Sequence, residues 1–257
     1  MKKKTSLLVI WGVILCVIGL VVVGASVTFA VKDYEAFTNY TDKEIVLNED
    51  INYDFDFATS DVVIHKTAEA KTKVTAKLVK DADLTLEGNK IAISKKNIWG
   101  VLSMYFKNKI DIYLGTDIEN NDIKILINAS TLKSDTEITL NKFNFEANAS
   151  SGDLKNIIAD SVNMKINAGS FEIKDSTIDK LHIDVNAGNV KIKTAVNTFT
   201  FIANAASIDS YIKGAKADYK RAVDLAAASS NLGSSFEGTK TISGKVTAGS
   251  ADFEFES

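Results

Sequence analysis

The sequence predicts an all-β protein, a parallel β-solenoid with coils of about 19–20 residues, preceded by one N-terminal transmembrane helix. Three observations support this prediction. An uncharged apolar run lies near the N-terminus, a short motif recurs at a nearly constant step, and apolar residues alternate with polar ones inside each copy of the motif.

The apolar run is long enough to cross a membrane. It extends from Thr5 to Val31 and contains no charged residue. A spanning helix needs about 20 apolar residues, whereas the core of a secretion signal has only about 7–15. We therefore predict that residues 1–31 form a cytoplasmic tip and an uncleaved anchor, with residues 5–31 in the membrane. Small residues ending at Ala25 and at Ala30 leave cleavage by a signal peptidase open.

The charges at the ends of this run predict its orientation. Lys2, Lys3 and Lys4 precede it, and positively charged flanks stay in the cytoplasm. We expect a single-pass protein of the cell membrane with an extracytoplasmic β domain. Acidic residues outnumber basic ones, most clearly after the run, which argues against a nucleic-acid partner. The only cysteine, Cys16, lies inside the run, so the external part can form no disulfide.

An internal repeat organises the external part. A short apolar strand ends in a corner of small residues, and a second strand follows. The corners are Ile127-Asn128-Ala129-Ser130, Ala147-Asn148-Ala149-Ser150, Ile166-Asn167-Ala168-Gly169, Val185-Asn186-Ala187-Gly188, Ala203-Asn204-Ala205-Ala206, Leu225-Ala226-Ala227-Ala228 and Val246-Thr247-Ala248-Gly249. The corner alanines therefore follow one another at a nearly constant step along the chain. A step this even predicts stacked coils.

Alternation within each copy indicates strands with one buried face. Leu181, Ile183 and Val185 are separated by His182 and Asp184, a period of two. At the corners, glycine and asparagine tolerate positive φ, and alanine allows neighbouring backbones to approach closely. We predict regular solenoid repeats over residues 116–257 and an irregular β region that caps them over residues 32–115. The alternative architecture is a pair of antiparallel β-sandwiches.

These elements carry a resemblance. The strand from Ile110 to Leu114 and the repeated corners are followed by Gly-x-apolar elements. These elements are Gly152-Asp153-Leu154, Gly169-Ser170-Phe171 and Gly188-Asn189-Val190. Over residues 45–257 the chain resembles the bacterial putative-adhesin family of β-strand-repeat proteins of unknown function. The resemblance implies a surface-exposed β-solenoid without established catalytic residues.

The residues that could carry catalysis are scattered. His65 and His182 are the only histidines, and no motif spacing gives either a metal-ligand partner. Arg221, the only arginine, is expected in a surface loop. Ser210 and Lys213 match a Ser-x-x-Lys pattern, but its companion motifs are missing and the match falls at a strand end. We therefore expect no enzyme, no cofactor and no metal site.

Two acidic groups and one aromatic run stand apart. Asp54 and Asp56 share a strand face, and a turn gathers Asp117, Glu119 and Asp122. Either group could collect oxygen ligands for a hard cation, but a solvated acidic surface is the favoured interpretation of both. Residues 98–106 break the alternation, and their Trp99, Tyr105 and Phe106 are the candidate contacts with a membrane or a partner. The favoured interpretation of the run is a hairpin or short helix that covers the open end of the solenoid.

The even repeat without a convergent catalytic set favours a non-enzymatic cell-surface module. Its strand faces would present polar side chains to an unknown protein or glycan of the cell envelope. One alternative is an accessory or sensor protein of an envelope-stress system, based on the anchor and the aromatic run. A glycan-active β-helix enzyme is the third, and it would require carboxylates that converge near a lysine or arginine.

Overall fold

The computed structural model describes residues 41–47, 52–88, 90–94, 108–116 and 121–256. The predicted anchor of residues 5–31 and the aromatic run of residues 98–106 lie outside these ranges. Within them, no helix has the length and apolar character needed to cross a membrane.

Residues 42–257 form one compact unit, and its described part is almost entirely β-structure, which confirms the all-β prediction. In that part, two short 3-10 helices, η1 (Asp81–Asp83) and η4 (Lys216–Asp218), interrupt the strands. The strands are β1 (Thr41–Val46), β2 (Asn52–Ala58), β3 (Ser60–Lys66), β4 (Lys73–Val79), β5 (Leu84–Glu87), β6 (Lys90–Ile93), β7 (Asn108–Leu114), β8 (Asp122–Asn128), β9 (Thr131–Ser134), β10 (Ile138–Asn148), β11 (Ser150–Lys155), β12 (Ile157–Ile166), β13 (Gly169–Lys213), β14 (Tyr219–Leu225), β15 (Ala228–Ser230) and β16 (Lys240–Glu256).

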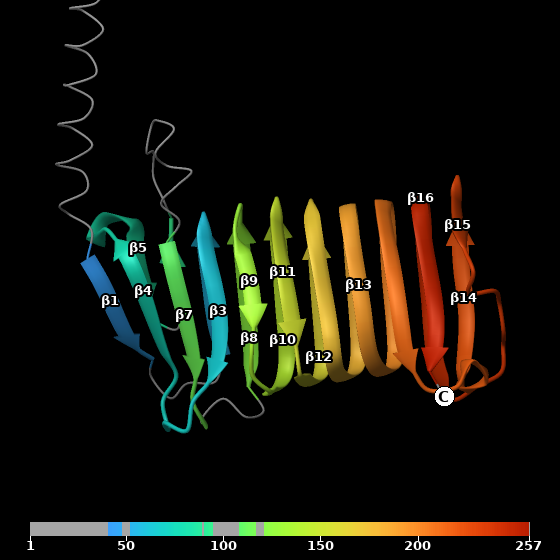
Figure 1. Cartoon of the computed structure of the whole chain (residues 1–257), viewed down its shortest axis with the longest axis horizontal. Coiled ribbons are helices and arrows are strands. Elements are labelled where there is room, and N and C mark those ends of the chain that lie inside the picture. The colour runs from blue at the N-terminus through green and yellow to red at the C-terminus, as the bar shows by residue number, and fades with distance from the viewer. Residues whose placement is uncertain (1–40, 48–51, 89, 95–107, 117–120, 257) are drawn as a thin grey trace, which may run out of the picture. The chain divides into compact units, whose positions relative to one another are not determined.

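Each coil consists of one strand that leads up to the asparagine corner and one that leaves it, and consecutive coils pair in parallel (Figure 1). The strands that lead to the corner make face A: β2, β8, β10, β12, residues 177–185 and 196–203 of β13, residues 241–248 of β16, and β14. Those that leave it make face B: β3, β7, β9, β11, residues 169–174, 188–193 and 205–213 of β13, residues 249–256 of β16, and β15. The fold is β-solenoid-like. Its consecutive coils pair in parallel, whereas the alternative architecture of two β-sandwiches would have antiparallel pairing.

The asparagines of the corners form a ladder of amide hydrogen bonds along the stack. The Nδ2 of Asn148 donates to Oδ1 of Asn128 at 2.7 Å, and Asn186 donates to Asn167 at 2.8 Å. Asn167 donates to Asn148 in the same way, and Asn204 donates to Asn186 at 2.7 Å. Each asparagine between the ends therefore both donates and accepts, which holds adjacent coils in register.

The backbone at the corners differs from the prediction. The positive φ belongs to Ala129 and Ala149, at 51° and 50°, whereas the ladder asparagines do not adopt it. Left-handed alanine costs about 1–2 kcal/mol, so the surrounding coils must hold it in place. In the next coils the positive φ lies one position later, at Gly169 and Gly188, with φ of 146° and 131°. A Cβ on Gly188 would lie 1.9 Å from the carbonyl oxygen of Gly169, so this position requires glycine.

The core is a set of inward-facing rows that run through the coils. On face A, Phe143 and Phe145 are buried and stacked, and Phe199 and Phe201 are buried side by side further along. Alternation therefore predicted the buried residues correctly. A small residue in one coil makes room for a large one in the next. A Cβ on Gly152 would lie only 2.5 Å from the ring of Phe171 in the neighbouring coil, so glycine leaves the space that this ring fills.

At the C-terminal end, the order of the coils in space differs from their order in the chain. The last strand, β16, pairs with residues 198–213 of β13 on one side and with β14 and β15 on its other side. The final coil of the sequence thus lies inside the stack, and the coil before it forms the end (Figure 1). The steps between corner alanines give no sign of this exchange, because both coils have similar lengths.

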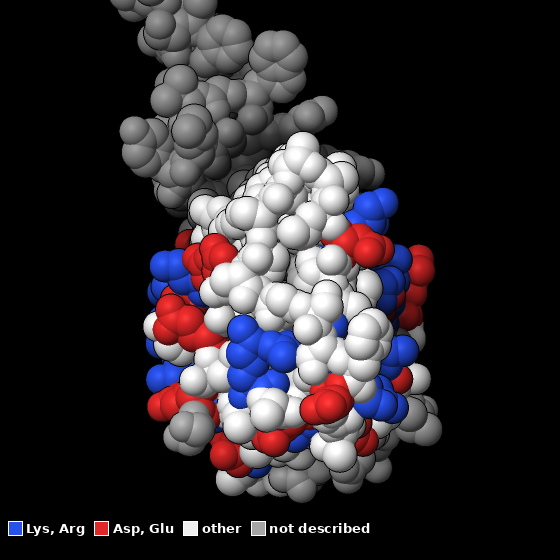
Figure 2. All heavy atoms as spheres, turned by 90° about the vertical axis from the view of Figure 1, so that its right-hand side faces the viewer, with Lys and Arg blue, Asp and Glu red and all other residues white. Residues whose placement is uncertain are grey.

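The end formed by β14 and β15 faces the viewer in Figure 2. Uncharged side chains cover much of this end, and acidic and basic side chains gather along the two flanks, where the outer faces of the coils lie (Figure 2). The flanks, which are faces A and B, thus carry much of the charge in this view, and a smaller group of charged side chains lies on the lower part of the end (Figure 2).

The N-terminal end shows the same exchange of order. The β2–β3 coil pairs with β8 and β9 on one side and with β6 and β7 on the other, although β6 and β7 come later in the chain. Two antiparallel pairings, β4 with β7 and β5 with β6, complete this end. The first and last coils of the repeat are therefore both enclosed by other strands.

Candidate interaction groove

Two rows of outward side chains on face A border a groove that runs across the strands. The first row contains Asn144, Asn163 and His182, which are register partners on β10, β12 and β13. The second contains Glu146, Lys165 and Asp184 in the same coils. Neighbouring strands lie about 4.8 Å apart, so the groove presents one polar pair per coil at that interval.

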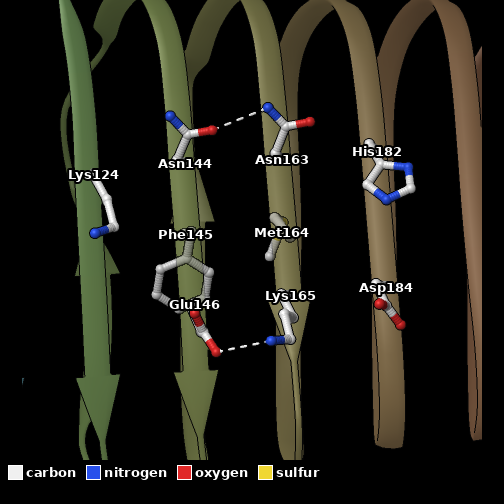
Figure 3. A pocket seen from close by; sticks show the side chains of 9 residues that line it. All are labelled: Lys124, Asn144, Phe145, Glu146, Asn163, Met164, Lys165, His182 and Asp184. Carbon is white, nitrogen blue, oxygen red and sulfur yellow. Dashed lines mark hydrogen bonds and ion pairs between the residues drawn. The ribbon is translucent and has the colours of Figure 1, made fainter.

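The groove has a shallow hollow of about 260 Å³ over the inward-facing Phe145 and Met164 (Figure 3). A second hollow of about 380 Å³ begins at His182 and extends over Phe201 and Gly244 toward β14. Because both hollows share His182, they form a single linear feature along face A, from Lys124 to Asp224.

Hydrogen bonds fix most of the groove's side chains. Asn163 donates from Nδ2 to Oδ1 of Asn144 at 3.0 Å, and Lys165 contacts Glu146 at 3.1 Å. His182 Nδ1 lies 2.8 Å from the hydroxyl oxygen of Thr200 in the next coil. The groove is thus a preformed surface with both donors and acceptors.

One polar atom beneath the groove lacks a hydrogen-bond partner. Oδ1 of Asp184 is shielded from solvent and has no hydrogen-bond partner among the described residues. Lys165 is its register partner but binds Glu146 on the opposite side. A buried carboxylate oxygen without a donor is costly.

The side chains of the groove do not converge on a point. Glu146, Lys165 and Asp184 project side by side from successive parallel strands (Figure 3). The lysine is engaged by one of the two carboxylates. This geometry suits repeated contacts along an extended partner better than attack on a single bond.

The predicted contact residues Trp99, Tyr105 and Phe106 lie outside the described residues. His65 proves to have carboxylate partners that sequence spacing could not indicate. Its Nε2 lies 3.0 Å from Asp111 and its Nδ1 lies 3.0 Å from Asp135, because β3 is enclosed between β7 and β9. No group of three or more His, Cys, Asp or Glu within the described ranges is arranged to hold a metal ion.

Arg221 lies in strand β14, so the expected surface loop is wrong at this position. Its guanidinium donates to the carbonyl oxygen of Leu232 at 3.1 Å. Ser210 and Lys213 lie at the end of β13, as expected, but Ser210 is buried and Lys213 is exposed, so the two side chains point to opposite sides.

The acidic candidates are in part neutralised. Asp54 on β2 forms an ion pair with Lys124 at 3.1 Å, and Asn141 donates to Asp122 at 2.8 Å. Asp56 lies on the same face as Asp54, as predicted. Asp117 and Glu119 lie outside the described residues.

The fold and its groove define the chain as a repeat protein of stacked parallel coils with polar outer faces. It belongs to the Toastrack DUF4097 family, whose model matches residues 51–257. This result agrees with the resemblance inferred from the corners and the Gly-x-apolar elements. A search of curated proteins finds no match.

Solved structures from several bacteria match most of the chain. A "putative adhesin" from Bacteroides fragilis is 14% identical, with a TM-score of 0.48 over 83% of this chain and 96% of that one. A "putative lipid binding protein" from Parabacteroides distasonis is 15% identical, with a TM-score of 0.46 over 84% and 97%. A "putative cell adhesion protein" from Clostridium sporogenes is 15% identical, with a TM-score of 0.35 over 84% and 100%. These names describe those proteins.

Proposed function

We propose that this protein is a non-enzymatic cell-surface module that binds an extended polar partner of the cell envelope along the groove of face A. The observation that carries the proposal is the row of Asn144, Asn163 and His182 beside the row of Glu146, Lys165 and Asp184, repeated from coil to coil. A linear protein or glycan could make one weak contact per coil, and such contacts add along the stack.

The anchoring part of the proposal rests on the sequence. The uncharged run from Thr5 to Val31 and the lysines before it support a single-pass membrane protein with the β unit outside the cytoplasm. Cleavage near Ala25 or Ala30 would convert a tethered module into a secreted one and leave the β unit unchanged.

Binding to isolated envelope fractions tests the groove. The full chain in detergent should co-sediment with cell-wall material or capture a membrane protein. Lys165→Ala combined with Asp184→Ala should weaken this binding about thirtyfold or more, because each of the two lost charged contacts contributes about 1 kcal/mol or more. Lys180→Ala with Asp160→Ala removes the same two charges from exposed positions of face A outside the groove and serves as the control. Equal binding by both double variants would contradict the groove as the site.

The rival function is glycan cleavage, because two carboxylates flank Lys165. We expect the purified chain to release no soluble product from a panel of cell-wall glycans. Turnover that disappears in Glu146→Gln or Asp184→Asn would replace the binding proposal with the enzymatic one.

A further inference from the structure

The C-terminal end of the stack has a projecting half and a recessed half. The projecting half is the loop between β15 and β16, residues 231–239. In this loop Ser235 forms an isolated antiparallel bridge with Arg221, and Thr239 donates its N–H to the carbonyl oxygen of Asp218 at 3.0 Å. The loop therefore follows the first half of β14, and Figure 1 shows it beyond β14 in the lower half of the right-hand end.

The second half of β14, next to the corner, has no such cover. Among the described residues, β14 pairs with β16 on one side, and its other side carries only the bridge at Arg221. Leu225 belongs to the alternating set that begins with the buried Tyr219, so it points toward the core side, yet it is 48% exposed. Val223 and Ala228 are partly buried beside the core. These three residues, Val223, Leu225 and Ala228, define a recess where the end of the core is open.

The projecting half carries an apolar side chain that matches this recess. Phe236 is 91% exposed, the highest value of any large apolar side chain among the described residues. The turn that carries it is fixed by the Glu237 N–H, which donates to Oγ of Ser235 at 3.3 Å. A single exposed apolar residue is ordinary on a protein surface. Here, however, an exposed ring and an open piece of core lie on the same end of one chain.

We propose that this end binds the same end of a second copy around a two-fold axis, so that Phe236 of each copy fills the recess of the other. The axis lies in the plane of the end and runs from face A to face B. It turns the end of one copy onto the end of the other, reverses the strand direction and keeps face A beside face A. The projecting half of each copy thus meets the recessed half of the other.

The positions of the two halves suit this operation. Ser235 lies beside Arg221, and Leu225 lies about 13 Å further along β14, at about 3.3 Å per residue. An axis that crosses β14 near Val223 exchanges these two heights. Both halves lie in the layer of face A, because the bridge at Ser235 extends that sheet. The two loops then share one strand position between the two β14 strands, and each loop fills half of it.

Other arrangements of the same two ends fit less well. A two-fold axis parallel to the strands would set loop against loop and recess against recess, which holds the ends apart. The corner of the recessed half, Leu225-Ala226-Ala227-Ala228, has no charged residue, and uncharged side chains cover the upper part of the end in Figure 2. An apolar ring can therefore enter without burying an unpaired charge. Because one end supplies both matching halves, a second copy is the partner that it fits.

The contact would join two stacks end to end. β1 lies at the other end of the sheet, so the two β1 strands lie at the far ends of the pair. Because the axis keeps face A beside face A, both grooves lie on the same side, and a long partner could contact the two grooves at once. The contact itself uses a different surface from the groove and does not depend on the function proposed above.

Serine substitutions test the contact on the full chain in detergent, with association measured by sedimentation equilibrium. The unmodified chain should self-associate. Phe236→Ser and, separately, Leu225→Ser should each weaken self-association at least about tenfold, because each removes apolar area that the pair buries. Ile158→Ser removes a side chain that is 39% exposed on face A and should leave self-association unchanged, as the matched control. Circular dichroism of all variants should match that of the unmodified chain.

Cysteine pairing tests the direction of the axis in a Cys16→Ser background. Under air oxidation, Phe236→Cys chains mixed with Leu225→Cys chains should form disulfide-linked heterodimers, and either variant alone should form far fewer dimers. The proposal is overturned if the unmodified chain is monomeric or if Ile158→Ser weakens association as much as Phe236→Ser does. It is also overturned if Phe236→Cys alone cross-links as efficiently as the mixture, because that result requires an axis parallel to the strands.

Discussion

Gly244 on β16 leaves the space that the ring of Phe201 occupies, because the two residues are register partners and a Cβ on Gly244 would lie 2.6 Å from that ring. On the other side of β16, Val223 is the register partner of Gly244. If the coils stacked in chain order, with the corner alanine Ala227 beside Ala205, Val223 would lie beside Phe201 instead. A glycine next to the phenylalanine therefore favours the enclosed position of β16.

Gly244→Ala should destabilise the fold by about 1–3 kcal/mol, because the added methyl group overlaps the Phe201 ring in a close-packed core. Denaturation with urea, followed by circular dichroism, measures this change. Phe201→Leu in the same chain should recover part of the loss, since a smaller side chain leaves room for the methyl group. Losses that add without any recovery would show that the two residues do not share this space.

Asn167→Ala should destabilise the stack by about 1–3 kcal/mol, because Asn167 both donates to Asn148 and accepts from Asn186. Urea denaturation of the purified chain gives the value. Asn189→Ala removes an exposed asparagine from face B, outside the ladder, and provides the control. A control loss as large as that of Asn167→Ala would argue against the ladder as the cause.

Tyr219 should make the fold sensitive to alkaline pH. Burial, with a smaller effect of the Asp218 carboxylate, raises the pKa of Tyr219 to about 12. Its hydroxyl donates to the carbonyl oxygen of Val196 at 2.7 Å. Because the pKa in the folded state lies above the ordinary value of about 10, the stabilisation is complete below about pH 10 and disappears as the pH rises toward about 12.

Tyr219→Phe should therefore be less stable than the unmodified chain near neutral pH, by about 1 kcal/mol for the lost hydrogen bond. It should also lose less stability between about pH 10 and 12. Urea denaturation across this range compares the two chains. Tyr211→Phe, on the surface, is the control, and parallel pH profiles for Tyr219→Phe and the unmodified chain would contradict this prediction.

His65→Phe should weaken the N-terminal junction by about 1–2 kcal/mol, because it leaves Asp111 and Asp135 without their shared partner. Phenylalanine preserves the stacking that His65 makes on Tyr113, with ring centres 4.9 Å apart. Hydrogen exchange of the amides in β3 and β7 should report the change locally. His182→Phe on face A should leave these amides unaffected, and exchange that accelerates equally in both variants would refute the junction's role.

The local structure was largely predictable from the sequence. Alternation around Leu181 and Ile183 identified the buried rows, and the small residues from Ala129 onward identified the corners. Both signals depend on neighbours in the chain, where a period of two and a need for small side chains leave a direct mark. The family followed from the same features.

The arrangement of coils at the ends was not predictable, because it depends on contacts between distant residues. Phe201 and Gly244 are far apart in the sequence, and nothing near either residue marks them as neighbours. The same holds for His65 and its two carboxylates.

The groove was missed for a similar reason. Asn144, Asn163 and His182 become one row only when the register of three strands is known. The aromatic candidates Trp99, Tyr105 and Phe106 lie outside the described residues, so their role stays a prediction.

The enclosed position of β16 also determines how the chain resists force. If the last coil of the sequence were the outermost one, tension at the C-terminus could peel it away along a single ladder. Instead β16 pairs with β13 on one side and with β14 and β15 on the other. Residues 240–246 and 249–251 of β16 are held by a second ladder, whereas residues 252–256 pair with β13 alone. A mechanical load that reaches residues 240–251 is therefore shared between the coils on both sides of β16.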